Sequence, residues 1–434
     1  MNCSAAVVAD LGFGDAGKGT LTDWLVRRTG ASLVVRYNGG AQAGHTVVCD
    51  DGRSHTFAQF GAGSFVPGVR THLSRFMIVH PGGLWREADA LARLGVEDGL
   101  ERLTVSGQAL LISPFLQAAG RLREVLRGAN RHGSCGIGVG ETVRDSLEHP
   151  PDSLRAGDLL LDVECLQRKL QRQQARKWEE FAPHRQQLLA DPQGAREWAI
   201  LESHSAAQEW IEMAAGLAGR VAEDCWPGGA SLVLEGAQGV LLDEWRGFHP
   251  HTTWSTCTFD NALELLKGWD GEVLRLGVLR SYATRHGAGP FPTEDPELHV
   301  EEAHNGNGPW QGPFRLGWLD GVLLRYALEA CGGVDGLAVT HLDSVDSRWQ
   351  MATAYEGISA LELGPWQDLA YQESLTRLLE QARPIYQELG GESLVSLLEE
   401  HSGVPVWVES HGPRPRDKRE TGAPFGSHQG FDRG

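Results

Sequence analysis

The segment Ala5-Ala-Val-Val-Ala-Asp-Leu-Gly-Phe-Gly-Asp-Ala-Gly-Lys-Gly-Thr20 joins a short apolar run to a glycine-rich turn. An uninterrupted apolar run that stops at glycine is typical of a strand buried in a parallel sheet. The turn has the G-x-x-x-x-G-K spacing of a phosphate-binding loop, and residues 21–28 after it have helical spacing. The alternative is a glycine turn that merely packs strand on helix. Strand, loop and helix in this order predict an α/β fold.

Similar apolar runs recur along the chain and are separated by stretches long enough for helices. They cover residues 32–36, 231–234, 273–279 and 336–340. Strands that alternate with helices favour a large, mostly parallel central sheet with flanking helices. We therefore expect one α/β domain over residues 1–434.

Other segments differ in character from the predicted sheet. Residues 155–222 are rich in Gln, Arg, Leu, Glu and Ala and predict a helical insertion. Residues 366–401 predict a further helical stretch with an apolar stripe. The stripe would consist of Leu378, Ile385, Leu389 and Leu397. Residues 294–313 predict a loop, and residues 412–434 predict a flexible basic tail.

Composition limits the classes of partner. The chain has 434 residues, of which 41% are hydrophobic and 22% charged, as is typical of a globular protein. Its formal net charge of −18 argues against nucleic acid or an anionic membrane as the main partner. The seven cysteines are scattered and form no CxxC pair, which argues against a disulfide framework or a zinc site. With no leader and no membrane-length apolar run, we expect a cytoplasmic protein.

A second glycine-rich turn, Gly39-Gly-Ala-Gln-Ala-Gly-His-Thr46, follows the next predicted strand. His45 is a candidate general acid because imidazole titrates near neutral pH, and the alternative is a structural histidine. Asp15 lies among amides that would bind phosphate, so its carboxylate would repel the ligand unless it binds a metal ion or a proton. Gly19 stands where an ordinary phosphate loop has a Mg²⁺-binding hydroxyl, which argues against a GTPase switch.

The pairing of G-D-x-G-K-G with G-G-x-x-A-G-H-T resembles the opening signature of the adenylosuccinate synthetase family. Later motifs agree in order along nearly the whole chain. They are Leu234-Glu-Gly-Ala-Gln238, Tyr282-Ala-Thr-Arg285 with Gly287-Ala-Gly-Pro290, Gly317-Trp-Leu-Asp320, Thr340-His-Leu-Asp343 and Ser410-His-Gly-Pro413. The resemblance implies that family's fold with its P-loop-like phosphate site, a homodimer, and the substrates IMP, GTP and aspartate with Mg²⁺.

The resemblance also implies catalytic roles for four residues. Asp15 would take the N1 proton of a purine and bind Mg²⁺, while His45 would stabilise charge on the phosphoryl group in transfer. Lys18 would supply a fixed positive charge, and Gln238 would hold the 6-oxygen of the purine. An amine would then displace the phosphorylated oxygen, so the implied reaction is C–N ligation.

Binding residues follow from the same motifs. The nucleotide and its phosphates would contact Gly14, Gly17, Gly19, Thr20, Asp343, Ser410 and Gly412. The other substrates would contact Gln42, Ser134, Arg144, Thr253, Arg285 and Arg315. Gly44 would offer its carbonyl oxygen to Mg²⁺. Asp343 would accept hydrogen bonds from guanine, and the alternative for this residue is a helix cap.

Several positions depart from the family pattern. Before Gly317 the chain retains one arginine, Arg315, where the family has two threonines and a run of arginines that clamp the aspartate carboxylates. Gln42 replaces the family's asparagine, and His341 replaces the lysine before the guanine-reading aspartate. The amine donor, the purine acceptor and the choice of GTP or ATP therefore stay open. The alternatives are an ordinary adenylosuccinate synthetase, a divergent ligase and a non-catalytic nucleotide-binding homologue.

Overall fold

The computed structural model describes residues 4–128, 135–226, 229–300, 312–346, 348–389 and 393–422. Within these residues the largest sheet has ten strands, in the order β19-β18-β15-β11-β1-β10-β2-β5-β7-β9. Their bounds are β1 (Ser4–Asp10), β2 (Leu33–Arg36), β5 (Arg70–Leu73), β7 (Leu103–Ser106), β9 (Val221–Ala222), β10 (Leu232–Glu235), β11 (Glu272–Arg280), β15 (Gly336–Thr340), β18 (Val406–Ser410) and β19 (Lys418–Glu420). Neighbours pair in parallel except β18 with β19. The predicted mostly parallel sheet is confirmed.

Strand β1 is buried on both faces, as its apolar run predicts. Ala5 and Val7 belong to the core shared with α9 (Asp260–Leu265) and α10 (Gly321–Ala330). Val8, on the opposite face, belongs to the core shared with α1 (Lys18–Thr29). Alternate side chains of a strand point to opposite faces, so one strand can serve two cores.

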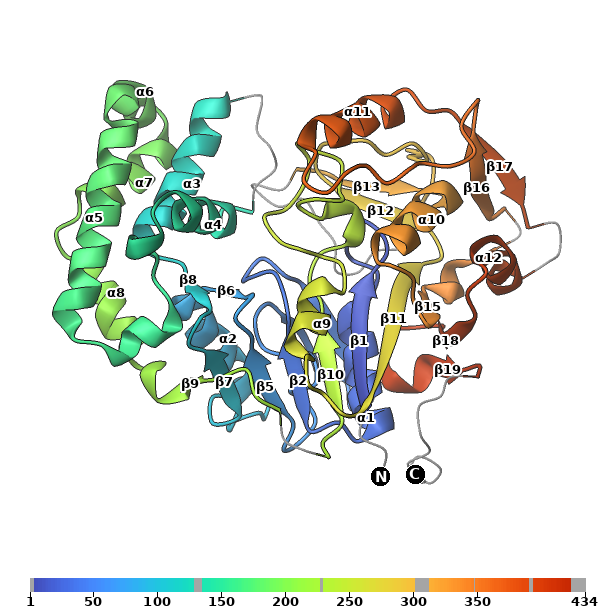
Figure 1. The fold of residues 1–434 in the computed structure, drawn as a ribbon, viewed down its shortest axis with the longest axis horizontal. Coiled ribbons are helices and arrows are strands. Elements are labelled where there is room, and N and C mark those ends of the chain that lie inside the picture. Colours follow the sequence, from blue (N-terminus) through green and yellow to red (C-terminus); the bar gives the residue numbers. More distant parts are fainter. Residues whose placement is uncertain are drawn as a thin grey trace.

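A group of helices lies at the β7 and β9 end of the sheet (Figure 1). It contains α2 (Pro81–Arg93), α3 (Pro114–Arg127), α4 (Val139–Glu148), α5 (Val163–Phe181), α6 (Arg185–Ala190), α7 (Pro192–Glu202) and α8 (Ala206–Ala215). Leu170, Trp198 and Trp210 are buried in its core together with side chains of β7. The segment predicted as a helical insertion, residues 155–222, contains the last four of these helices. Its final residues 221–222 form strand β9 rather than helix.

The continuous helical stretch predicted for residues 366–401 is wrong. Two helices, α11 (Leu369–Leu379) and α12 (Leu394–Ser402), are separated by strand β17 (Pro384–Glu388). Pro384 lacks the N–H that a helix needs, and β17 instead pairs with β16 (Gln350–Tyr355). Ile385 lies in this strand with 49% of its surface exposed, so it is not part of a helical core stripe.

The predicted flexible tail is wrong over residues 412–422. The short helix η8 (Pro415–Asp417) reverses the chain, and β19 then pairs with the edge strand β18. An unpaired sheet edge leaves backbone donors and acceptors open, and the pairing of β19 with β18 satisfies those of β18.

Two predicted segments are described in part. Residues 423–434 of the predicted tail lie outside the described residues. Of the predicted loop 294–313, the described residues 294–300 and 312–313 form neither helix nor strand.

Two small sheets cover the carboxyl end of the central sheet. One pairs β12 (Ala283–His286) with β13 (Phe314–Gly317), and the other contains β14 (Leu319–Asp320), β16 and β17. Further short pairs are β3 (His45–Val48) with β4 (Ser54–Phe57) and β6 (Ile78–Val79) with β8 (Leu110–Leu111). No helix in the described ranges combines the length and the apolar character needed to span a membrane.

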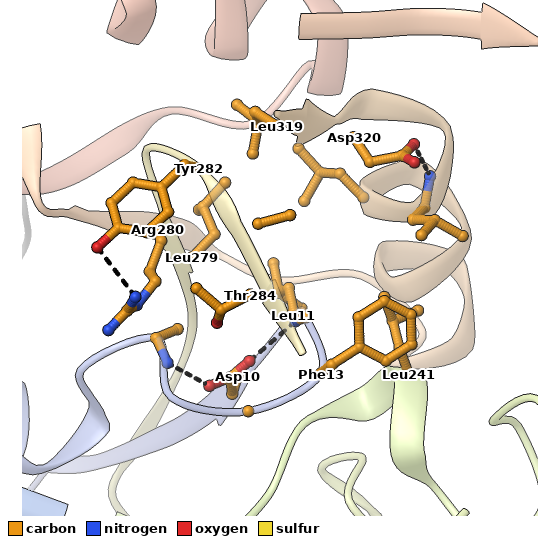
Figure 2. A pocket seen from close by; sticks show the side chains of 16 residues that line it. Asp10, Leu11, Phe13, Leu241, Leu279, Arg280, Tyr282, Thr284, Leu319 and Asp320 are labelled. Atoms are coloured by element: carbon orange, nitrogen blue, oxygen red, sulfur yellow. Dashed lines mark hydrogen bonds between the residues drawn. The ribbon is translucent and has the colours of Figure 1, made fainter. Parts of the chain in front are cut away.

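Asp320, from the Gly-Trp-Leu-Asp motif, has a structural role. Its carboxylate accepts hydrogen bonds from Val322 N and Leu323 N at the start of α10 and from the Tyr355 hydroxyl. Burial raises the pKa of Asp320 to about 6, against the lowering effect of these donors. Figure 2 shows Asp320 and Leu319 beside a cavity of about 50 Å³ that also reaches Asp10 behind the phosphate loop.

We expect Asp320→Ala to lower the free energy of unfolding by about 1–3 kcal/mol, because α10 loses its cap and the Tyr355 hydroxyl is left buried without an acceptor. Urea unfolding followed by circular dichroism measures this. Tyr355→Phe removes one donor and leaves the cap intact, so it should cost less. Equal losses in the two variants would contradict the capping role.

Candidate active site

A cavity of about 710 Å³ lies at the carboxyl ends of β1, β10, β11, β15 and β18. Ligands of open α/β sheets bind at this edge. Most of the predicted site residues line this one cavity. They are Gly14, Asp15, Gly17, Lys18, Gly19, Thr20, Gln42, Gly44, His45, Gln238, Asp343, Ser410 and Gly412. The fold thus brings together segments from both ends of the chain.

The first glycine turn has the backbone of an anion-binding loop. Gly14, Asp15 and Gly17 all have positive φ angles, of 96°, 60° and 87°. Helix α1 begins directly after Gly17, and among the described residues no side chain caps its first turn. The free N–H groups of this helix start therefore face the cavity, where phosphate oxygens can accept hydrogen bonds from them.

Gly19 is explained by the second glycine turn. A Cβ atom built at Gly19 would lie 2.7 Å from the His45 carbonyl carbon and 2.9 Å from the His45 Cβ. A serine or threonine, the usual residues here in phosphate loops, therefore has no room. The glycine lets His45 come close to the start of α1.

Lys18 forms a buried ion pair with Asp10, a residue that the sequence motifs do not single out. Its Nζ lies 2.8 Å from Asp10 Oδ2, and both side chains are almost fully buried. Asp10 also accepts hydrogen bonds from Gly12 N and Ala16 N, each at 2.9 Å, and Figure 2 shows this carboxylate behind the loop. Asp10 thereby fixes both the loop and its lysine. In the sequence, the position of this acid at the end of the first apolar run is the feature that could have indicated its role.

His45 forms a second buried pair, with Glu235 at the end of β10. His45 Nδ1 lies 2.6 Å from Glu235 Oε1, and Glu235 Oε2 accepts a hydrogen bond from Ala62 N. The Arg36 Nε is 3.9 Å from the same carboxylate. Glu235 belongs to the matched Leu-Glu-Gly-Ala-Gln motif, but the motif by itself does not predict a role for it. It orients the imidazole of His45 toward the cavity.

Burial lowers the pKa of His45 to about 4, because desolvation and the charges of Arg36 and Lys18 outweigh the attraction of Glu235. The imidazole is therefore neutral at pH 7, which does not support the expectation that His45 titrates near neutral pH. An anionic ligand beside the ring would raise its pKa.

Asp15 faces the cavity with its side chain 30% exposed. Its Oδ2 lies 3.1 Å from His286 Nε2, and its carbonyl oxygen accepts a hydrogen bond from Arg280 Nε at 2.7 Å. Burial raises the pKa of Asp15 less than His286, Lys18 and Arg280 lower it, so the net shift is downward. Neither His286 nor Arg280 was singled out from the sequence.

Two carboxamides leave polar atoms unpaired at the cavity. The Oε1 atoms of Gln42 and Gln238 are buried and make no hydrogen bond within the described residues. Buried polar atoms are nearly always paired, so a polar ligand is the natural partner for both side chains. Gln238 also has a left-handed backbone, with φ of 58°.

The carboxyl-terminal segments form the other end of the cavity. The exposed Asp343 carboxylate makes no hydrogen bond with any other described residue, so it is not a helix cap and can accept from a ligand. The Thr20 hydroxyl donates to the Pro413 carbonyl at 2.6 Å, which ties α1 to the segment that follows β18. Lys418 Nζ donates to the Gly412 carbonyl and supports the same segment.

Four predicted substrate residues do not line the cavity. Arg144 pairs with Glu148 and Glu180 in the helical group, and Thr253 donates its backbone N–H to Leu242. The other two of these four, Arg285 and Arg315, support the turn formed by residues 287–290. A fifth predicted substrate residue, Ser134, lies outside the described residues.

Arg285 is 2% exposed and donates to the backbone carbonyls of Ala288, Pro290 and His251. Its guanidinium lies 4.1 Å from the Phe13 ring centroid. Arg315 pairs with Glu294 and donates to the carbonyls of Gly287 and Gly289. Both guanidinium groups are thus engaged by the protein itself.

The predicted Mg²⁺ ligands fit a site for that ion. Asp15 offers a partly exposed carboxylate and Gly44 lines the same cavity with its exposed backbone. Mg²⁺ takes oxygen ligands and commonly uses one or two carboxylates with substrate phosphates and water. Such a site needs no larger cluster, and none of three or more His, Cys, Asp or Glu occurs in the part of the chain that the structure describes.

Comparison with known proteins decides the family. A family model described as adenylosuccinate synthetase matches residues 7–414. The adenylosuccinate synthetase of Marinomonas sp. (strain MWYL1) is 31% identical over 447 aligned residues, which cover 96% of this chain and 97% of that protein. The chain belongs to the adenylosuccinate synthetase family of C–N ligases. The adenylosuccinate synthetase of Thermus thermophilus is 32% identical and covers 93% of this chain and 96% of its own length.

Solved structures support the same fold. A fully ligated adenylosuccinate synthetase from Plasmodium falciparum has a TM-score of 0.76 at 21% identity and covers 97% of this chain and 100% of its own. The succinoaminodeoxyadenylate synthetase of cyanophage S-2L, bound to dGMP and dATP, has a TM-score of 0.61 at 17% identity over 98% and 97% of the two chains. The family resemblance and the predicted fold are confirmed.

Gly19→Ser should disrupt the contact between the two glycine turns, because the new Cβ overlaps the His45 backbone. We expect a stability loss of about 1–3 kcal/mol and a large loss of nucleotide binding, measured by thermal unfolding and calorimetry. Gly219→Ser is the matched control, since nothing lies within 4 Å of a Cβ at that position. A Gly19→Ser protein that binds nucleotide normally would contradict this packing argument.

The depressed pKa of His45 predicts a loss of stability in acid. The unfolded chain takes up this proton near pH 6.5, while the folded protein does so near pH 4, so stability falls as pH drops between these values. Between pH 6.5 and pH 4 the free energy of unfolding should therefore fall less in His45→Gln than in the parent protein. The difference between the two losses should be at most about 3 kcal/mol. Urea unfolding at pH 7 and pH 5 tests this, and identical pH dependence in both proteins would contradict it.

Proposed function

We propose that this chain phosphorylates the 6-oxo group of IMP, or a related purine monophosphate, with GTP and Mg²⁺ and then adds the amine of an amino acid, aspartate in the first instance. The products are an adenylosuccinate-type nucleotide, GDP and phosphate. The observation that carries the proposal is the shared cavity, in which both glycine turns, Gln238 and the Asp343 segment face one another. The proposal extends to a cytoplasmic homodimer of single-domain chains with residues 155–222 as an insertion.

Asp15 takes the proton from purine N1, which makes the 6-oxygen nucleophilic. That oxygen attacks the γ-phosphorus of GTP, and GDP leaves. Lys18 and the N–H groups at the start of α1 hold the phosphates, while Gln238 positions the 6-oxygen. His45 stabilises the transferring group once the bound anion has raised its pKa. The amine then attacks C6, and phosphate leaves with the electrons of the C–O bond.

The remaining roles follow from the same arrangement. Asp15 and the Gly44 carbonyl would hold Mg²⁺, which would supply positive charge next to the phosphates. The carboxylate of Asp343 accepts hydrogen bonds from the guanine N1 and N2 groups, beside Ser410 and Gly412. Gln42 contacts the acceptor nucleotide. We keep Ser134, Arg144, Thr253, Arg285 and Arg315 as predicted substrate contacts that ligand-bound structures can test.

Purified protein with GTP, Mg²⁺, IMP and aspartate should release phosphate and form a product with a changed ultraviolet spectrum. We expect Asp15→Asn to lower kcat at least about 100-fold, because the base that removes the N1 proton is lost. The GTP affinity of the variant, measured by calorimetry without Mg²⁺, should change little, because Asp15 is assigned to the purine proton and the metal ion. Unchanged turnover in Asp15→Asn would show that the assigned base is wrong.

A screen that crosses purine monophosphates with amino acids, using GTP and then ATP, assigns the substrates. Phosphate release that requires another amine or purine would replace aspartate or IMP in the proposal. Nucleotide binding without phosphate release under every combination would instead indicate a non-catalytic nucleotide-binding homologue.

A further inference from the structure

Asp15 has a backbone conformation that its side chain does not favour. Its φ angle is 60°, in the left-handed region that glycine adopts easily and other residues rarely do. Such residues persist where surrounding contacts hold them, and they cluster at functional sites.

Two side chains from outside the loop contact Asp15. Arg280, at the end of β11, donates from Nε to the Asp15 carbonyl oxygen at 2.7 Å, and its Nη1 donates to the Tyr282 hydroxyl at 3.0 Å. His286, at the end of β12, places Nε2 at 3.1 Å from Asp15 Oδ2. Arg280 thus holds the backbone of Asp15, while His286 holds the carboxylate.

The ring of His286 is itself fixed by packing. It lies 4.8 Å from the Phe314 ring, centroid to centroid, and Phe314 is its partner across the β12–β13 ladder. Its Nδ1 is buried and has no hydrogen-bond partner among the described residues. A buried N–H without an acceptor is costly, so we place the donor N–H of the His286 ring on Nε2, toward Asp15.

We propose that His286 is a positioning residue for Asp15, holding one carboxylate oxygen so that the other faces the reacting ring. This inference rests on the proposed function, in which Asp15 removes the N1 proton. Within the described residues no hydrogen-bond donor contacts Asp15 Oδ1, so that oxygen is free to act on the substrate. A carboxylate displaced by about 1 Å can cost about 100-fold in rate.

The test compares two substitutions of His286. H286F keeps a ring against Phe314 but removes the donor, whereas H286Q keeps an N–H donor of similar reach. We expect H286F to lower kcat by about 10- to 100-fold with KM values for GTP and IMP within about 3-fold of the parent. H286Q should restore kcat to within about 3-fold. Equal kcat in H286F and the parent, or no rescue by H286Q, overturns the proposal.

His72 provides the matched control. It lies on β5, its Nε2 is 2.9 Å from Asp224 Oδ1, and it packs edge-on against Trp226. H72F therefore also removes a histidine–aspartate contact beside an aromatic ring, but away from the cavity. Its kcat per folded molecule should match the parent. A fall as large as that of H286F would show that losing a histidine–aspartate contact away from the cavity lowers kcat just as much, and would overturn the proposal.

Crystal structures separate this inference from the proposed function. In the parent and H286Q proteins, Asp15 should keep its left-handed backbone and its carboxylate position, whereas in H286F the carboxylate should move away from the cavity. This comparison needs no turnover. If the parent protein releases no phosphate with any substrate, the proposed function fails. If Asp15 stays in place in H286F, the positioning role fails.

Discussion

Close packing of backbone on backbone at the ends of three neighbouring strands is the constraint on which the site depends. Gly19 leaves no room for a side chain beside His45, and Gly239 likewise packs directly against the backbone of Gly12 and Gly14. Glycine is required because a Cβ atom at either position would overlap main-chain atoms. Because these turns touch, Lys18, His45 and Gln238 face one cavity although they follow different strands.

Buried acids hold the basic side chains of this site. Asp10 balances the charge of Lys18, whereas Glu235 lies near Arg36 and contacts the neutral imidazole of His45. A buried charge without a partner is strongly unfavourable, so removing Asp10 would leave Lys18 with that cost. The protein as a whole has a net charge of −18, so the attraction for anionic nucleotides must come from backbone N–H groups and local cations rather than from the overall field.

The predicted catalytic residues and the two predicted arginine contacts differ in how the structure uses them. Asp15, His45 and Gln238 face the cavity, two of them in left-handed backbone conformations. Arg285 and Arg315, by contrast, hold a neighbouring turn together through its carbonyl oxygens. A guanidinium used in this way can bind a carboxylate ligand only by giving up some of these contacts.

The sequence alone determined the parallel sheet, the phosphate loop and the family, because buried strands, glycine turns and ordered motifs are local patterns. It did not determine that residues 384–388 form a strand or that β19 pairs with β18, since strand pairing depends on a distant partner. The partners Asp10, Glu235 and His286 became visible in the tertiary structure alone. Each acts through a short contact with a residue on another segment, and its depth of burial sets the electrostatics, as the low pKa of His45 illustrates.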